Sequence, residues 1–93
     1  MKWLEIIELR TVQMDPPDLQ QQVAYWVNEM KEDQGMAIYF NLQVETDWII
    51  QLHHESEKVA LRGSDFGRRL KEMLKRSGLV NHSIWVEKSP WND

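Results

Sequence analysis

The chain has 93 residues, no cysteine and a formal net charge of −4 at pH 7. A chain of this length builds one small core, so we expect residues 1–93 to form a single domain. Without cysteine there are no disulfides, no thiolate metal sites and no thiol nucleophile. No apolar run approaches the roughly 20 residues that span a bilayer, and no signal peptide precedes the first apolar pattern. These features predict a cytoplasmic protein with no membrane partner.

Residues 3–12 form an aliphatic run that is typical of a β-strand. Both faces of this strand are apolar, which is typical of a central strand that is covered from two sides. One face carries Leu4 and Ile6, and the other carries Trp3, Ile7 and Leu9.

A helix is predicted to begin at residues 15–18, with the sequence Asp-Pro-Pro-Asp. Asp15 can cap the free backbone N–H groups, and Pro16 suits the first helical position. Gly35 suits the end of this segment. Apolar residues at helical spacing would form its buried stripe, namely Leu19, Val23, Trp26, Val27 and Met30.

Residues 36–56 alternate between apolar and polar side chains on either side of Glu45, Thr46 and Asp47, which predicts a β-hairpin. A three-residue loop places the large apolar side chains on one face, whereas a two-residue turn would break that face. The loop would pair Val44 with Trp48, Leu42 with Ile50 and Phe40 with Leu52.

Residues 64–87 predict a second helix followed by a last strand. Ser64 is the expected N-cap, Asp65 suits the first turn, and Gly78 ends the helix. The helix would bury Phe66, Leu70, Met73 and Leu74. In the strand, His82, Ile84 and Val86 share one face, and Ser83, Trp85 and Glu87 share the other.

The predicted order is β-α-β-β-α-β, which is the ferredoxin-like α+β arrangement: a four-stranded antiparallel sheet with two helices on one face. The right-handed crossover rule places the first and third strands in the centre of this sheet.

Two helices cover only one face of such a sheet, and exposed apolar patches usually mark an interface. We therefore expect a homodimer that pairs sheet against sheet. The expected interface residues are Trp3, Ile7, Leu9, Tyr39, Asn41, Gln51, His53 and Trp85.

The closing segment SDFGRRLKEMLKRSGLVNHSIWVEKSP and the strand WIIQLHHES resemble the dimeric α+β barrel superfamily, in particular its small antibiotic-biosynthesis-monooxygenase-like proteins. The resemblance implies a ligand pocket between sheet and helices, and oxidation of an aromatic or polyketide-like substrate by dioxygen without metal or flavin. A related haem-degrading branch uses an asparagine in the first strand and a histidine on the second helix. Residues 3–12 contain no Asn and residues 64–77 contain no His, which argues against haem degradation.

His54 and His82 are the candidate catalytic bases, because both belong to the predicted helix-facing side of the sheet. A histidine hydrogen-bonded at the rim of the core is the structural alternative. Trp26, Phe40 and Trp48 are the candidate walls of a small-molecule pocket, or else ordinary core residues. The adjacent His53 and His54 point to opposite faces and cannot hold one metal ion together, so no metal or cofactor is expected.

Two other functions stay open. One is a non-catalytic dimeric binding or regulatory module whose pocket is filled by side chains. The other is an anion or nucleic-acid binder that uses residues 58–76, which carry seven basic and two acidic side chains. The expected uncovered face offers Tyr39 and Trp85 but no Arg or Lys, which argues against nucleic acid as a partner.

Overall fold

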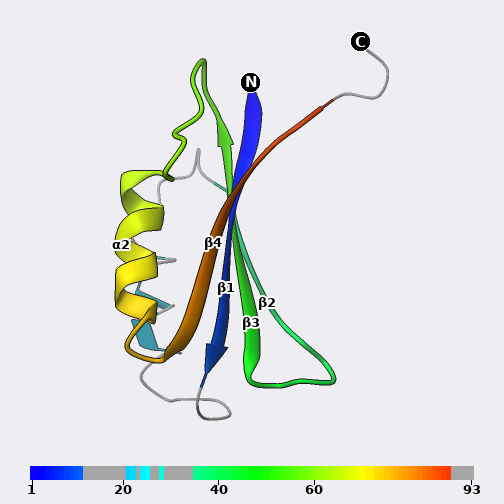
Figure 1. Cartoon of the computed structure of the whole chain (residues 1–93), viewed down its shortest axis with the longest axis vertical. Helices are drawn as coiled ribbons and strands as arrows, with labels where there is room; N and C mark the ends of the chain where they lie inside the picture. Colours follow the sequence, from blue (N-terminus) through cyan, green and yellow to red (C-terminus); the bar gives the residue numbers. More distant parts are fainter. Residues whose placement is uncertain (12–20, 23, 26–27, 29–34, 89–93) are drawn as a thin grey trace.

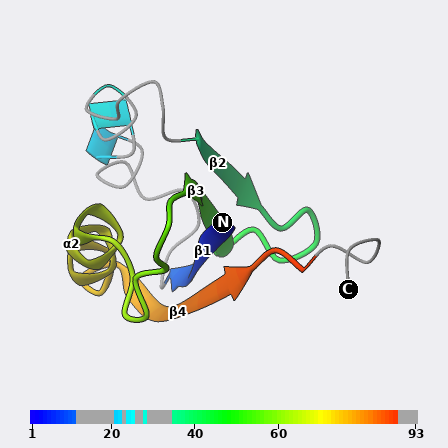
Figure 2. The same cartoon turned by 90° about the horizontal axis from the view of Figure 1, so that it is seen from above.

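The computed structural model describes residues 1–11, 21–22, 24–25, 28 and 35–88. Its four strands form one antiparallel sheet in the order β2-β3-β1-β4, and helix α2 lies against one face of that sheet (Figures 1 and 2). The elements are β1 (Lys2–Thr11), β2 (Gly35–Phe40), β3 (Asp47–Glu55), α2 (Asp65–Leu74) and β4 (Gly78–Val86).

The prediction of an α+β fold with a four-stranded antiparallel sheet is confirmed, with the first and third strands in its centre. Among the described residues only α2 is a complete helix, so the predicted ferredoxin-like pattern with two helices is not seen there. The predicted first helix lies largely outside the described residues, although residues 21, 22, 24, 25 and 28 have helical backbone. None of the described helical residues belongs to a helix that is long and apolar enough to span a membrane.

Helix α2 begins and packs as its sequence predicts. The Ser64 side chain accepts a hydrogen bond from the Gly67 N–H group, and Asp65 lies in the first turn. Leu70 and Leu74 are buried against the two central strands. The core that results consists of Ile7, Leu9, Ile50, Leu52, Leu70 and Leu74.

The predicted register of the β2–β3 hairpin is wrong by four residues. Trp48 lies opposite Phe40 rather than Val44, and residues 41–46 form the connection. The Asn41 side chain explains this, because it accepts hydrogen bonds from the N–H groups of Gln43 and Val44 and turns the chain early. An even shift keeps the side chains that stay in the two strands on their predicted faces, whereas Leu42 and Val44 move into the exposed connection.

The predicted orientation of β1 is also wrong. Trp3, Ile7 and Leu9 were expected on the uncovered face, but all three are buried, and Ile7 and Leu9 join the core with α2. Both faces of β1 are apolar, so alternation alone does not decide which face the helix covers. Leu4 and Ile6 lie on the opposite side, which we call the open face: the sheet face opposite α2.

Candidate functional site

The most unusual feature of the sheet is a carboxylate in its core. Glu5 of β1 is 0% exposed, although its strand neighbours in the same phase are apolar. Nε2 of His54 lies 2.6 Å from Glu5 Oε2, and Nε2 of His82 lies 2.9 Å from Glu5 Oε1. The two central strands and β4 therefore bring both predicted histidines onto one buried acid.

The first turn of α2 completes this group. The Ser64 N–H donates to Glu5 Oε1 at 3.0 Å, and the Ser64 hydroxyl donates to Glu5 Oε2 at 2.5 Å. The same hydroxyl accepts a hydrogen bond from the Gly67 N–H at 3.0 Å. An ionised Glu5 therefore has four donors, and its charge lies at the positive end of the helix dipole. We call Glu5, His54, Ser64 and His82 the Glu5 cluster.

Two glycines make room for the Glu5 cluster. A Cβ atom on Gly63 would lie 2.3 Å from Cε1 of His82, and a Cβ on Gly67 would lie 2.2 Å from Glu5 Oε1. Gly63 also has a φ of 94°, which other residues rarely adopt. The connector and α2 can approach the sheet this closely only because these positions lack side chains.

Trp3 fixes the other side of the cluster. Its ring stacks on His54 with a centroid separation of 4.1 Å and an interplanar angle of 22°. Its indole N–H donates to the Ser56 hydroxyl at 2.9 Å. These contacts hold the His54 ring in one orientation, since its Nε2 atom is bonded to Glu5 at the same time.

The geometry of the Glu5 cluster is that of a buried polar network and not of a nucleophile with its base. The Ser64 hydroxyl bonds to Glu5 and Gly67, and neither histidine contacts it among the described interactions. The side chains of His54 and His82 are only 10% and 5% exposed. No group of His, Asp or Glu in the described part of the chain is arranged to hold a metal ion. The network joins three strands to the start of α2.

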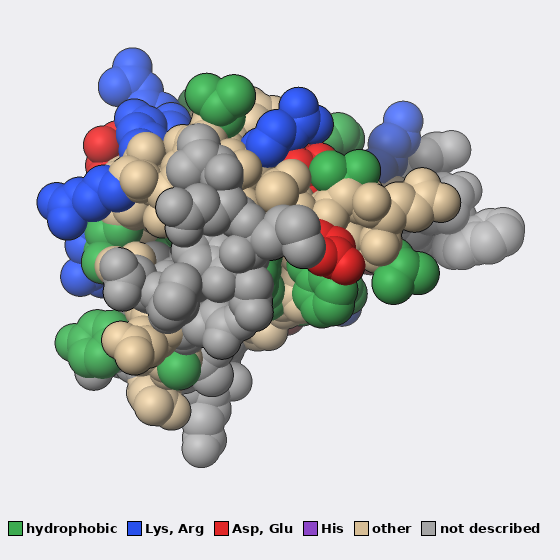
Figure 3. Space-filling model, turned by 90° about the horizontal axis from the view of Figure 1, so that it is seen from below, with side chains coloured by type: hydrophobic (Ala, Val, Ile, Leu, Met, Phe, Trp, Pro, Cys, Tyr) green, Lys and Arg blue, Asp and Glu red, His purple; other side chains and the backbone are tan. Residues whose placement is uncertain are grey.

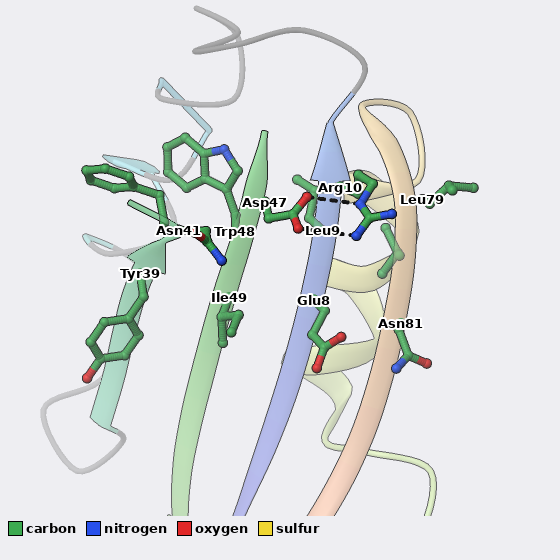
Figure 4. A pocket seen from close by; sticks show the side chains of 12 residues that line it. Glu8, Leu9, Arg10, Tyr39, Asn41, Asp47, Trp48, Ile49, Leu79 and Asn81 are labelled. Carbon is green, nitrogen blue, oxygen red and sulfur yellow. Dashed lines mark hydrogen bonds and ion pairs between the residues drawn. The ribbon is translucent and has the colours of Figure 1, made fainter. Parts of the chain in front are cut away.

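The predicted ligand walls lie elsewhere. Phe40 and Trp48 line a depression of about 400 Å³ at the end of the sheet where β1 finishes, together with Tyr39, Ile49 and Leu79 (Figure 4). Trp48 and His54 are six positions apart along β3, a span of about 20 Å at the rise of a β-strand. The predicted bases and the predicted walls do not form one site. Trp26, the third predicted wall, lies outside the described residues.

The depression has a polar side as well as an apolar one. Arg10 and Asp47, which face each other across β1 and β3, form a two-pronged ion pair with Nε–Oδ1 and Nη2–Oδ2 distances of 3.0 and 3.3 Å. The hydrogen bond to Asp47, and then its charge, raise the pKa of Arg10 above its usual value. No described residue accepts a hydrogen bond from the Trp48 indole N–H, which is shielded from solvent.

Glu5 is the functional-site candidate that sequence reasoning missed. The sequence signal for Glu5 is its position in the alternation of the strand. Glu5 falls between Trp3 and Ile7, on the strand face that those two residues make apolar. A lone acid in such a stripe needs donors when it is buried. The hydrogen-bond partners of Glu5 come from two histidines on the neighbouring strands and from the serine cap between Gly63 and Gly67.

Ser64→Ala should destabilise the fold by about 2 kcal/mol, because it removes both the helix cap and a donor to a buried carboxylate. The free energy of unfolding from urea titration measures this. Ser77→Ala is the control, since the described contact of Ser77 is a backbone hydrogen bond to Leu74. Equal losses in the two variants would show that Ser64 does not support Glu5.

No known protein-family model, curated protein or solved structure matches this chain.

Proposed function

We propose that this protein is a non-catalytic homodimeric binding module that pairs through the open face of its sheet and takes a small aromatic or apolar ligand. The observation that carries the proposal is the composition of the open face. We call residues that lie opposite one another on neighbouring strands a row. The two central rows of the open face contain no Lys, Arg, Asp or Glu: Leu4 with His53 and Trp85, and Ile6 with Gln51 and Ser83.

Charged side chains begin in the rows on either side of this centre. At one end Lys2 lies opposite Glu55, and at the other Glu8 follows Ile6, with the Arg10–Asp47 ion pair one position further out. Trp85 and Tyr39 are more than half exposed. An uncharged centre with exposed aromatics and a charged rim is the usual anatomy of a protein interface. A second copy, related by a two-fold axis, supplies a surface of the same kind.

The depression at Phe40 and Trp48 supports the ligand-binding half of the proposal. Its volume of about 400 Å³ suits a small organic molecule, and its walls are largely aromatic and aliphatic. The rings of Phe40 and Trp48 are tilted with centroids 6.1 Å apart. Several of its lining side chains, including Tyr39 and Ile49, belong to the open face, so a partner subunit would lie close to a bound ligand.

The finer fold is part of the same proposal. The strand order β2-β3-β1-β4 is that of a ferredoxin-like sheet, and the helical backbone at residues 21, 22, 24, 25 and 28 is consistent with the other helix of that fold. This arrangement is the one that the resemblance to dimeric α+β barrels implies. The resemblance also implies oxygenase activity, which the engagement of both histidines by Glu5 does not favour.

Ile6→Lys should convert a dimer to a monomer. The substitution places a charge at the centre of the open face, where it remains hydrated in a monomer but is buried in a dimer. We expect the dissociation constant from sedimentation equilibrium to rise by about 30-fold or more. Leu61→Lys is the control, since Leu61 is strongly exposed in the connector before α2. A monomeric wild-type protein at high concentration would overturn the dimer.

The oxygenase alternative makes a different prediction. An oxygenase should consume dioxygen with a dihydroxyaromatic or anthrone-like probe, and His54→Ala should abolish that uptake. A binding module should bind the same probe without uptake, as followed by tryptophan fluorescence, and Phe40→Ala should weaken the binding. Phe40 is exposed, so its loss leaves the core intact. Dioxygen uptake that His54→Ala removes would overturn the non-catalytic proposal.

A further inference from the structure

A second hollow lies on the other side of the molecule, between α2 and the edge strand β4. Its volume is about 490 Å³. Its floor includes His82, and its rim is supplied by the connector before α2 and by the helix itself. The lining residues are Leu61, Arg62, Arg68, Lys71, Glu72, His82 and Ile84.

The charges around this hollow do not cancel. Glu72 is the one acidic side chain among the described residues that line it, and a hydrogen bond from Lys75 lowers the pKa of Glu72. Arg68 pairs with Asp65 on the same helix. Arg62 and Lys71 form no ion pair with any residue that the structure describes. Lys71 is attracted to Glu72 without forming an ion pair, since its charge also lowers the pKa of Glu72, and Arg62 has no partner carboxylate in the described chain.

The surroundings strengthen this local excess. Residues 58–76 carry a net charge of +5 in a chain whose total is −4. Figure 3 shows Lys and Arg side chains gathered on the side of the molecule that α2 occupies. Such a concentration of one sign raises the local concentration of an oppositely charged ligand.

His82 contributes a positioned polar atom at the floor. Its Nε2 atom is bonded to Glu5, so the ring orientation is fixed from beneath. No described residue forms a hydrogen bond with the other ring nitrogen, Nδ1. The ring therefore keeps one nitrogen for a ligand in the hollow that it lines.

We propose that this hollow binds the phosphate group of a small organic phosphate monoester. Arg62 and Lys71 contact the phosphate oxygens, His82 lies beneath them, and Leu61 and Ile84 provide apolar walls for the organic part. The described residues that line the hollow include no Phe, Tyr or Trp, which are the usual stacking surfaces for single-stranded nucleic acid. The proposal is independent of the dimer, because the hollow lies on the α2 side of the sheet.

Isothermal titration with phenyl phosphate and with inorganic phosphate at low salt tests the site. We expect both to bind, phenyl phosphate more tightly, and Arg62→Gln and Lys71→Gln each to weaken binding by about fivefold or more. Arg76→Gln is the matched control, because Arg76 belongs to the same basic segment but does not line the hollow. Equal losses in all three variants would indicate diffuse attraction and overturn the site, as would the absence of binding.

A second readout locates the ligand. Phenyl phosphate should shift the imidazole NMR signals of His82, while those of His53 on the open face should stay in place. Equal shifts of the two histidines would contradict the proposed position. Ile6→Lys should bind phenyl phosphate as the wild type does, so a failure of the dimer proposal leaves this result interpretable.

Discussion

Replacing Glu5 with Gln should lower the free energy of unfolding by about 3–5 kcal/mol, the cost of breaking a buried charged network by removing one partner. A domain of this size has a total stability of about 5–15 kcal/mol, so the loss is a large share of it. Glu5 is fully buried, and four polar groups from three elements form hydrogen bonds with its two oxygens.

The amide of Gln is nearly the same size as the carboxylate, so the effect isolates hydrogen bonding and charge. One of its two polar atoms becomes a donor, and on either side it must face a Ser64 group that donates to Glu5: the hydroxyl beside His54 or the N–H beside His82. A donor placed against donors leaves buried groups unpaired, and each such group costs about 1–3 kcal/mol.

Urea titration at a fixed protein concentration measures this loss, because dimer formation makes the apparent stability depend on concentration. Glu8→Gln is the control on the same strand, since Glu8 is exposed and should change stability by no more than about 0.5 kcal/mol. Amide hydrogen exchange should also show weaker protection in α2, whose first turn is bonded to Glu5. If Glu5→Gln is as stable as Glu8→Gln, the Glu5 cluster does not hold the helix to the sheet.

The sequence was sufficient to predict the parts of the fold that depend on short-range rules. Alternation located the strands, and Ser64 with its following acid located the start of α2. The crossover rule placed β1 and β3 in the centre of the sheet. Each of these rules depends only on residues that are close in sequence or on the order of the elements, and both can be read from the sequence.

The orientation of β1 depends on longer-range contacts, and the hairpin register depends on a local side-chain contact that alternation does not reveal. Leu4 with Ile6, and Ile7 with Leu9, make the two faces of β1 equally suitable for burial, so the choice is made by what α2 and Glu5 require. In the hairpin, one side chain that folds back on its own backbone, that of Asn41, ends β2 before alternation does.

The site was predictable only in part, for a related reason. His54 and His82 were assigned correctly to the α2 side of the sheet, yet their common partner was not identified, because an acid in a strand is usually exposed. Phe40 and Trp48 were assigned to the same pocket as the histidines because they share a face. A face of a long strand spans about 20 Å from Trp48 to His54, so sharing a face does not mean sharing a site.

Gly78→Ala should destabilise the fold by about 3 kcal/mol or more, and lower the melting temperature by more than about 10 °C. Gly78 begins β4 and lies opposite Thr11 of β1. A Cβ atom at this position would lie 1.9 Å from the carbonyl oxygen of Arg10 and 2.8 Å from its carbonyl carbon. Both atoms belong to the backbone of a central strand, which is paired on both sides and cannot move away without losing hydrogen bonds.

Gly35→Ala is the matched control, because Gly35 also begins a strand but a Cβ there would lie 3.4 Å from the nearest atom, Cβ of His53. That distance is an ordinary contact, so we expect a change within about 0.5 kcal/mol. Thermal unfolding of both variants at one protein concentration makes the comparison.

The sequence suggests that Gly78 serves to stop the helix, but α2 ends at Leu74 and Gly63 is the one described glycine with positive φ. If the two substitutions lower the melting temperature equally, the close approach of β4 to β1 at Gly78 is wrong. If only Gly78→Ala lowers it, this glycine is required because it lacks a side chain and not because of its backbone freedom.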